Sequence, residues 1–183
     1  IEAGAYTVTV TDAHGCTVTG GVTITEGNEI NIFTSTFPVT CFGGNNGQAL
    51  AFATGGAGVF QYNWSNGATG AQVTDLEAGV YTVFVTDLKN CVESTTVNVT
   101  EPDKLIITLN STPEVLGGAD GTVSVVAIGG TPPYTYIWST GSTTDSDEDL
   151  VAGEYFVTVT DHNGCSANDS INVVPSNCAF SAS

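Results

Sequence analysis

The sequence contains no arginine, no methionine and only two lysines, Lys89 and Lys104, against nineteen acidic residues, which gives a formal net charge of −17. Proteins that bind nucleic acid or anionic lipid draw much of their affinity from Lys and Arg, so both are excluded as partners. The chain also has no uninterrupted apolar run of about 18 residues, so we expect no membrane insertion. Its charge suits a protein that must stay soluble on a crowded surface.

Sequence signals of metal sites and of catalysis are missing as well. There is no CxxC or HxxxH pair, so the five cysteines favour disulfides in an oxidising, extracellular setting over a zinc site. His14 and His162 lie in turns, and no Ser or Cys has a recurring His partner. The sequence therefore predicts no enzyme and no cofactor. Because neither a signal peptide nor an initiator methionine opens the chain, we expect a segment of a longer mature protein.

The chain does contain a sixteen-residue stretch that occurs three times. The copies read IEAGAYTVTVTDAHGC at 1–16, LEAGVYTVFVTDLKNC at 76–91 and LVAGEYFVTVTDHNGC at 150–165. The tyrosines and the cysteines of successive copies lie 75 and then 74 residues apart. A fixed period of this length predicts a tandem array of small domains.

The period divides the sequence into four parts. They are the C-terminal part of a truncated repeat at 1–27, complete repeats at 28–101 and 102–175, and the first strand of a following repeat at 176–183. A domain of this size buries only about 60% of the surface of its unfolded chain, so each repeat is marginally stable alone. Because the junctions contain few linker residues, we expect a semi-rigid rod.

Within each repeat, short apolar and polar alternations stand between turns rich in Gly, Asn and Pro, which is typical of β-strands. In the first complete repeat we expect strands at 29–36, 48–54 and 59–65, and one or two edge strands within 69–76, before the recurring hairpin. Seven or so strands around a central Trp64 or Trp138 predict an all-β fold of tandem immunoglobulin-like β-sandwich domains.

The residues that recur at the repeat period have structural interpretations. Tyr6, Tyr81 and Tyr155 each follow an L-x-A-G or I-x-A-G text that has the form of a tyrosine corner, where the hydroxyl bonds back to the preceding connection. Asp12, Asp87 and Asp161 each end a strand at a turn. Capping of backbone N–H groups explains that recurrence better than chemistry does.

Three motifs together resemble a known family. They are GG-x-PPYTYIWSTG at 129–141, LVAGEYFVTVTDHNGC at 150–165 and C-x-GG-x-x-G at 41–47. This combination resembles SprB-type tandem repeats, which occur in gliding-motility and cell-surface adhesins exported by the type IX secretion system. The resemblance covers essentially the whole sequence and brings no catalytic residue. It departs from the family pattern at Val115, where the repeat usually has the cysteine seen at Cys41.

What this resemblance implies is a structural repeat segment of an extracellular adhesin or surface filament. Its partners would be neighbouring repeats of the same chain, other copies in a filament, and extracellular surfaces or glycans. The alternative function is a calcium- or glycan-binding module within a cell-surface protein.

Two disulfide pairings of Cys41 remain open. In an immunoglobulin-like topology Cys41 and Cys91 lie at opposite ends of one domain, roughly 20 Å apart, whereas a disulfide needs Cα atoms within about 7 Å. The favoured pairing is therefore Cys41 to Cys165 of the next repeat, and the alternative is Cys41 to Cys91. Under the favoured pairing, Cys16, Cys91 and Cys178 pair with cysteines outside this sequence.

Two further candidate sites stand outside the recurring pattern. Asp145, Asp147, Glu148 and Asp149 form the densest acidic cluster, which could hold Ca²⁺; a solvated acidic loop is the simpler interpretation. Ser170 lies in an Asp-Ser-apolar sequence that resembles a bacterial O-glycosylation motif.

Overall fold

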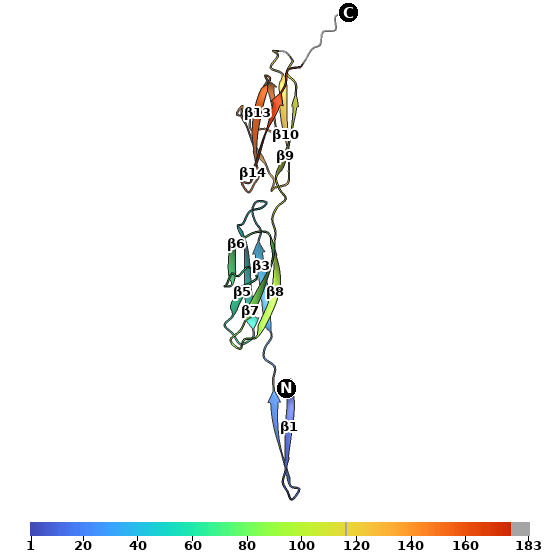
Figure 1. Ribbon diagram of the computed structural model, residues 1–183, viewed down its shortest axis with the longest axis vertical. Coiled ribbons are helices and arrows are strands. Elements are labelled where there is room, and N and C mark those ends of the chain that lie inside the picture. The colour runs from blue at the N-terminus through green and yellow to red at the C-terminus, as the bar shows by residue number, and fades with distance from the viewer. Residues whose placement is uncertain (116, 177–183) are drawn as a thin grey trace, which may run out of the picture. The chain divides into compact units, whose positions relative to one another are not determined.

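The computed structural model describes residues 1–115 and 117–176, and every regular element within them is a β-strand (Figure 1). The strands are β1 (Gly4–Thr11), β2 (Thr17–Ile24), β3 (Ile30–Phe37), β4 (Gly47–Gly55), β5 (Gln61–Trp64), β6 (Gln72–Leu76), β7 (Gly79–Thr86), β8 (Val92–Val99), β9 (Ile106–Thr112), β10 (Gly121–Ile128), β11 (Thr135–Trp138), β12 (Ser146–Leu150), β13 (Gly153–Thr160) and β14 (Ser166–Val173). Within the described residues, no helix is long and apolar enough to cross a membrane.

The first two strands form an antiparallel hairpin in which Gly4 pairs with Ile24 and Thr11 with Thr17. The alternation predicted for its first strand is present, but the apolar face is open. Val8 and Val10 are 62% and 59% exposed because β1 and β2 form a two-stranded sheet of their own. The equivalent valines of the later copies of this hairpin are buried.

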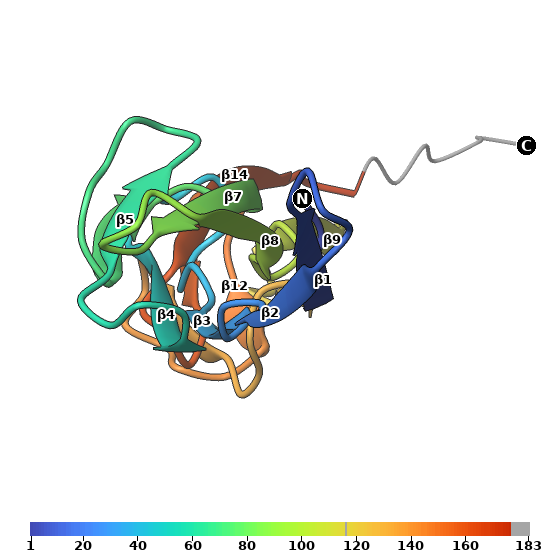
Figure 2. The same cartoon turned by 90° about the horizontal axis from the view of Figure 1, so that it is seen from below.

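Residues 28–101 and 102–175 each contain two three-stranded sheets. The strand orders are β3-β4-β6 and β5-β7-β8 in the first stretch, and β9-β10-β12 and β11-β13-β14 in the second. Figure 2 shows β7 and β8 in one layer and β3 and β4 in the other. These orders match the two sheets of an immunoglobulin constant-type sandwich, A-B-E and C-F-G, without strand D. The predicted all-β, immunoglobulin-like fold is therefore confirmed.

The expected number of strands needs a correction, because among the residues that the structure describes each sandwich has six strands rather than seven or so. The stretch 69–76 gives the single strand β6 and one isolated bridge between Asn63 and Thr69. The strand expected at 59–65 begins only at Gln61. Its first residue, Val59, has a φ of 37° and follows a glycine turn, so the chain is still turning where strand was expected.

The two sheets of each sandwich enclose a compact apolar core. In the second sandwich the core consists of Val123, Val125, Trp138, Leu150, Val157, Val159 and Val173, none more than 6% exposed. The indole N–H of Trp138 donates to the carbonyl of Thr144 at 3.0 Å, which allows a full-sized indole to be buried. Trp64 makes the same kind of bond, to the carbonyl of Gly70 at 2.9 Å.

The last glycine of the C-x-GG-x-x-G motif is fixed by close packing. A Cβ on Gly47 would lie 2.6 Å from Val99 and 2.8 Å from the carbonyl of Leu76, and one on Gly121 would lie 2.5 Å from Val173 and 2.8 Å from the carbonyl of Leu150. Each glycine therefore lets the second strand of its sandwich pass against the last strand.

Compact units within the chain do not follow the predicted repeat boundaries, which stay a prediction. One unit comprises Ile1–Ser35, Leu50–Gln72 and Tyr81–Val97. The other comprises Thr36–Ala49, Val73–Val80 and the chain from Asn98 onward. The loop that carries Cys41 thus belongs to the same compact unit as the second sandwich.

Equivalent valines in the hairpin and in the second sandwich allow a matched test of this core. Val157 is 1% exposed and Val8 is 62% exposed. Val157→Ala removes two buried methyl groups and should lower the free energy of unfolding by about 2 kcal/mol. Val8→Ala, the control, should change it by less than about 0.5 kcal/mol. Urea unfolding followed by tryptophan fluorescence measures both. Equal losses in the two variants would contradict this assignment of the core.

Candidate functional site

Each copy of the recurring hairpin turn is built around one aspartate. Oδ1 of Asp161 accepts hydrogen bonds from the backbone N–H groups of Asn163 and Cys165, both at 2.9 Å. The N–H of Asp161 donates to the carbonyl of Cys165, also at 2.9 Å. Asp12 and Asp87 make the same set of bonds in their turns, at 2.8 to 3.0 Å. The recurring aspartates therefore cap the turn that presents the cysteine.

The residue before each turn cysteine has a left-handed backbone conformation. Its φ is 84° at Gly15, 63° at Asn90 and 84° at Gly164. Gly and Asn are the residues that adopt this conformation at least cost, which explains why these two types occupy the position. The three turns thus share one backbone geometry as well as one set of hydrogen bonds.

In the two sandwiches the same aspartate also ties the hairpin to the rest of the domain. Oδ2 of Asp87 accepts from the N–H of Ala57, and Oδ2 of Asp161 accepts from the N–H of Thr131, both at 2.8 Å. These partners lie in the connections β4–β5 and β10–β11, which run from one sheet to the other. Each carboxylate therefore links its turn to the point where the chain changes sheets.

These bonds also set the acidity of the two carboxyl groups. Asp87 and Asp161 are 6% and 5% exposed, and burial by itself raises the pKa of a carboxyl group. The backbone N–H donors outweigh burial, so the pKa of each lies below its ordinary value of 3.8. Both carboxylates are therefore held ionised, in a structural role.

The loop that carries Cys41 is held by side chains that the sequence did not single out. Asn46 accepts from the N–H of Thr40 at 3.0 Å and donates to its hydroxyl at 2.7 Å. The N–H of Gly43 donates to the carboxylate of Glu101 at 2.5 Å. The polar residues of this Gly/Asn-rich loop therefore define its shape around the cysteine.

Cys41 is joined to Cys165 by a disulfide with an S–S distance of 2.03 Å and a Cα–Cα distance of 5.7 Å. Next to the bond, the side-chain amide of Asn163 donates to the carbonyl of Thr40 at 3.0 Å. The structure thus contains the pairing that sandwich geometry favoured. The alternative pairing with Cys91 is absent, because Cys91 is an exposed free cysteine.

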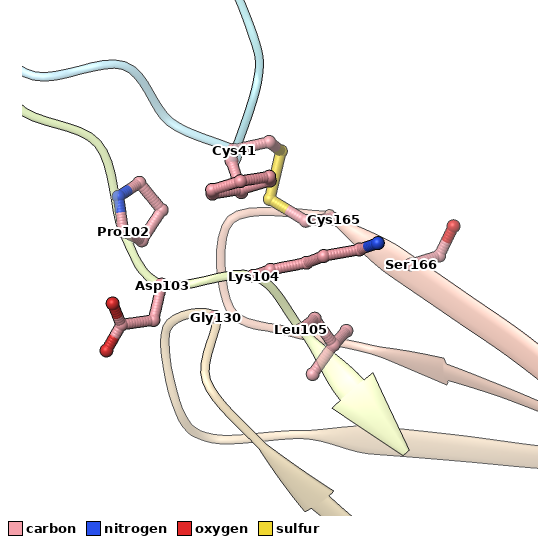
Figure 3. Close-up of a pocket in the computed structure, with 9 residues that line it drawn as sticks. Cys41, Pro102, Asp103, Lys104, Leu105, Gly130, Cys165 and Ser166 are labelled. Carbon is pink, nitrogen blue, oxygen red and sulfur yellow. A yellow bond between two sulfur atoms is a disulfide. The ribbon is translucent and has the colours of Figure 1, made fainter. Parts of the chain in front are cut away.

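A pocket of about 280 Å³ lies beside this disulfide (Figure 3). It is lined by the two bridged cysteines, by Phe42 and by chain that includes Pro102, Asp103 and Lys104. In Figure 3 the side chain of Lys104 runs alongside Cys165, with its amino group directed toward Ser166. Since both cysteines are only half-buried, a small reductant can reach the bond.

The other cysteines do not pair within the described residues. Cys16 and Cys91 are free and exposed, each in a turn with the geometry of Cys165. Cys178 lies outside the described residues, so the expectation for it stays a prediction. Val115, which stands in the position of Cys41, is 52% exposed. Its carbonyl accepts from the N–H of Gly118, just as the carbonyl of Cys41 accepts from the N–H of Gly44.

Glu114, next to Val115, is a buried acidic residue that the sequence analysis missed. It is 7% exposed, and its carboxylate accepts from the N–H of Ala152 at 2.7 Å. The N–H of Glu114 donates to the carbonyl of Val174 at 3.0 Å. In the first sandwich the fully buried Val39 makes the equivalent bond, to the carbonyl of Thr100 at 2.8 Å. No periodic pattern in the sequence marks this exchange of an apolar side chain for an acidic one.

Tyr6 and Tyr155 make the predicted contact. The hydroxyl of Tyr155 donates to the carbonyl of Val151 at 2.9 Å, and that of Tyr6 to the carbonyl of Glu2 at 2.8 Å. Tyr81 occupies the same position in β7. Both of these bonds join the hydroxyl to the chain four residues earlier, which is the geometry of a tyrosine corner.

The acidic cluster is not brought together as a cation site. Asp147, Glu148 and Asp149 are successive residues of β12 at a place where the strand is irregular, because Asp149 has a φ of 58° and the pairing with β10 shifts register. Asp147 accepts instead from the hydroxyl of Thr140 at 2.5 Å. Among residues 1–115 and 117–176, no group of three or more His, Cys, Asp or Glu side chains could hold a metal ion.

Ser170 lies in β14 and is half-buried. Its hydroxyl donates to the carboxylate of Glu154 on the neighbouring strand at 2.9 Å. Glycosylation at this residue stays a prediction, and the attached sugar would have to replace that hydrogen bond.

Comparison of the sequence with known families supports the resemblance stated above. Residues 34–69 and 116–143 match the family model of the SprB repeat. Each match lies within one of the two stretches that form a sandwich. The resemblance to SprB-type repeats is therefore confirmed, whereas no curated protein matches the sequence.

Several solved structures of immunoglobulin domains are similar to this chain. The N-terminal eight Ig domains of Down Syndrome Cell Adhesion Molecule match with a TM-score of 0.48 and 14% identity over 96% of this chain, which spans 28% of that chain. The amphioxus IgVJ-C2 molecule matches with a TM-score of 0.32 and 15% identity, over 82% of this chain and 98% of that one. The insect immune protein hemolin matches with a TM-score of 0.35 and 16% identity, over 94% of this chain and 56% of that one. These scores lie below 0.5, so the fold assignment rests on the strand orders and cores described above.

The lowered pKa of Asp161 predicts how stability depends on pH. A carboxyl group whose pKa is lower in the folded state stabilises the fold above its unfolded pKa and loses that contribution as pH falls through the folded value. The free energy of unfolding should therefore decrease below about pH 3.8. Asp161→Asn removes the charge, so this variant should be less stable at pH 7 and its curve should converge with the wild-type curve in acid.

Urea unfolding between pH 2 and pH 7 measures this difference. Asp12→Asn is the matched control, because Asp12 caps the same turn but belongs to the isolated hairpin. It should leave the unfolding of the sandwiches unchanged. Parallel curves for wild type and Asp161→Asn would show that the carboxylate charge has no such role.

Proposed function

We propose that this chain, in which two segments match the SprB repeat, is a structural segment of an extracellular bacterial adhesin or surface filament. In this role the complete repeats 28–101 and 102–175 act as spacer domains of a rod-like stalk. The parent protein would be exported by the type IX secretion system and serve adhesion or gliding motility. Its partners would be neighbouring repeats, other copies of the chain, and extracellular surfaces or glycans.

One observation carries this proposal: the disulfide from Cys41 to Cys165 joins the loop of one repeat to the hairpin turn of the next. A domain that acts alone has no need of a fixed covalent junction with its neighbour. A stalk does gain, because its repeats are small and each junction contains only a few residues. A disulfide also suits an oxidising, extracellular location.

The recurring residues support a structural role rather than a chemical one. The three aspartates cap turns, and the tyrosines close corners. The formal charge of −17 would keep closely spaced stalks apart and soluble in water.

Peptide mapping without reduction tests the covalent junction in protein recovered from the surface of the cells that make it. We expect one linked peptide pair that contains Cys41 and Cys165. Cys91→Ser, which removes an exposed free thiol, is the control and should leave this pair unchanged. A Cys41 peptide linked to Cys91 would overturn the junction, and absence of the protein from intact, antibody-labelled cells would overturn the surface location.

Small-angle X-ray scattering tests the rod. Two sandwiches placed end to end, at about 35 to 45 Å each, should give a maximum dimension of at least about 70 Å for residues 28–175. A maximum dimension near 50 Å would indicate sandwiches packed side by side and would contradict a spacer role.

A further inference from the structure

We infer that the disulfide between Cys41 and Cys165 carries tension past most of the two sandwiches instead of through them. We call this role a mechanical bypass. This inference rests on the proposed function, because only a stalk anchored at one end and bound at the other is pulled along its length. It follows from the covalent connectivity and from the positions of the two cysteines between strands.

The connectivity divides the chain into loaded and unloaded parts. Cys41 follows β3, and Cys165 directly precedes β14. The strands β4 to β13 lie between the two cysteines, inside a covalently closed loop of 124 residues. Tension applied to the two ends of the chain therefore passes from β3 through the disulfide to β14 and does not extend that loop.

The consequence is a limit on extension. Without the bond, forced unfolding of the two sandwiches would also extend the whole stretch of chain between Cys41 and Cys165. With the bond, the 124 residues of the loop stay out of the extended path. At roughly 3.5 Å per extended residue, this withholds about 430 Å of contour length.

Most of each core lies within this unloaded loop. Of the core residues of the second sandwich, only Val173 lies outside it, on β14. In the first sandwich, Ile30 on β3 and Val39 are outside, whereas Trp64, Val83 and Val85 are inside. A pulled chain can lose β3 and β14 while the strands between them are under no load, so each sandwich keeps most of the structure from which it can reform.

Single-molecule force spectroscopy on the 183-residue chain, held by non-cysteine tags at its termini, tests the bypass. The oxidised chain should reach a total contour length about 430 Å shorter than the same chain in a phosphine reductant. The reductant has access, because both cysteines are half-buried and border a pocket. Cys41→Ser should give the long contour length with or without reductant.

Cys91→Ser is the matched control, because it removes a free exposed thiol and should leave the short contour length unchanged. If Cys41→Ser does not fold, the comparison of oxidised and reduced wild-type chain still decides the question. Equal contour lengths in a sample whose peptide map contains the Cys41–Cys165 pair would overturn the bypass alone. A map without that pair would overturn the covalent junction and the bypass together.

Discussion

The structure depends on one interaction, the acceptance of backbone N–H bonds by the turn aspartate. In the second sandwich, one oxygen of Asp161 fixes the turn that ends at Cys165, and the other holds Thr131 in the connection between the two sheets. The cysteine therefore has a defined position relative to both sheets, although it lies at the tip of a hairpin. A hairpin without this cap would have no fixed direction in which to present a sulfur atom.

Because the cores of such small domains are small, the disulfide contributes to their stability. The inward-facing residues of β4 are Ala49, Ala51 and Ala53, whereas β10 has Val123 and Val125 in the first two of these places. At these two positions β4 therefore buries less apolar surface than β10 does. A disulfide that closes a long loop restricts the unfolded chain and compensates in part. The bond joins the loop after β3 to the hairpin turn before β14.

The sequence was sufficient for the fold class and for most of the strands, because both depend on local alternation and on a period that is repeated in the chain. It was also sufficient for the turn cap of Asp161 and for the tyrosine corner of Tyr155, because the partners in those bonds lie within four residues. The second contact of Asp161, with Thr131 30 residues away, was not predicted. It missed two local departures from regular strand geometry, the φ of 37° at Val59 before β5 and the φ of 58° at Asp149 in β12. It also failed where distant contacts decide.

Two residues beside the disulfide show the same limit. Glu101 and Asn163 bond to the loop of Cys41 from 58 and 123 residues away. Nothing in their own neighbourhood distinguishes them from other polar residues in turns. The buried Glu114 is a third case, since its partner Ala152 lies 38 residues further along.

The shared geometry of the three hairpin turns also bears on how such a gene can change. Because every turn presents its cysteine in the same way, a repeat gained or lost by recombination would meet a compatible neighbour on each side. The length of the array can then vary between lineages without any repeat having to adapt to a new position. Val115 marks the exception, since a junction that begins at this position lacks one of the two sulfur atoms that form the disulfide.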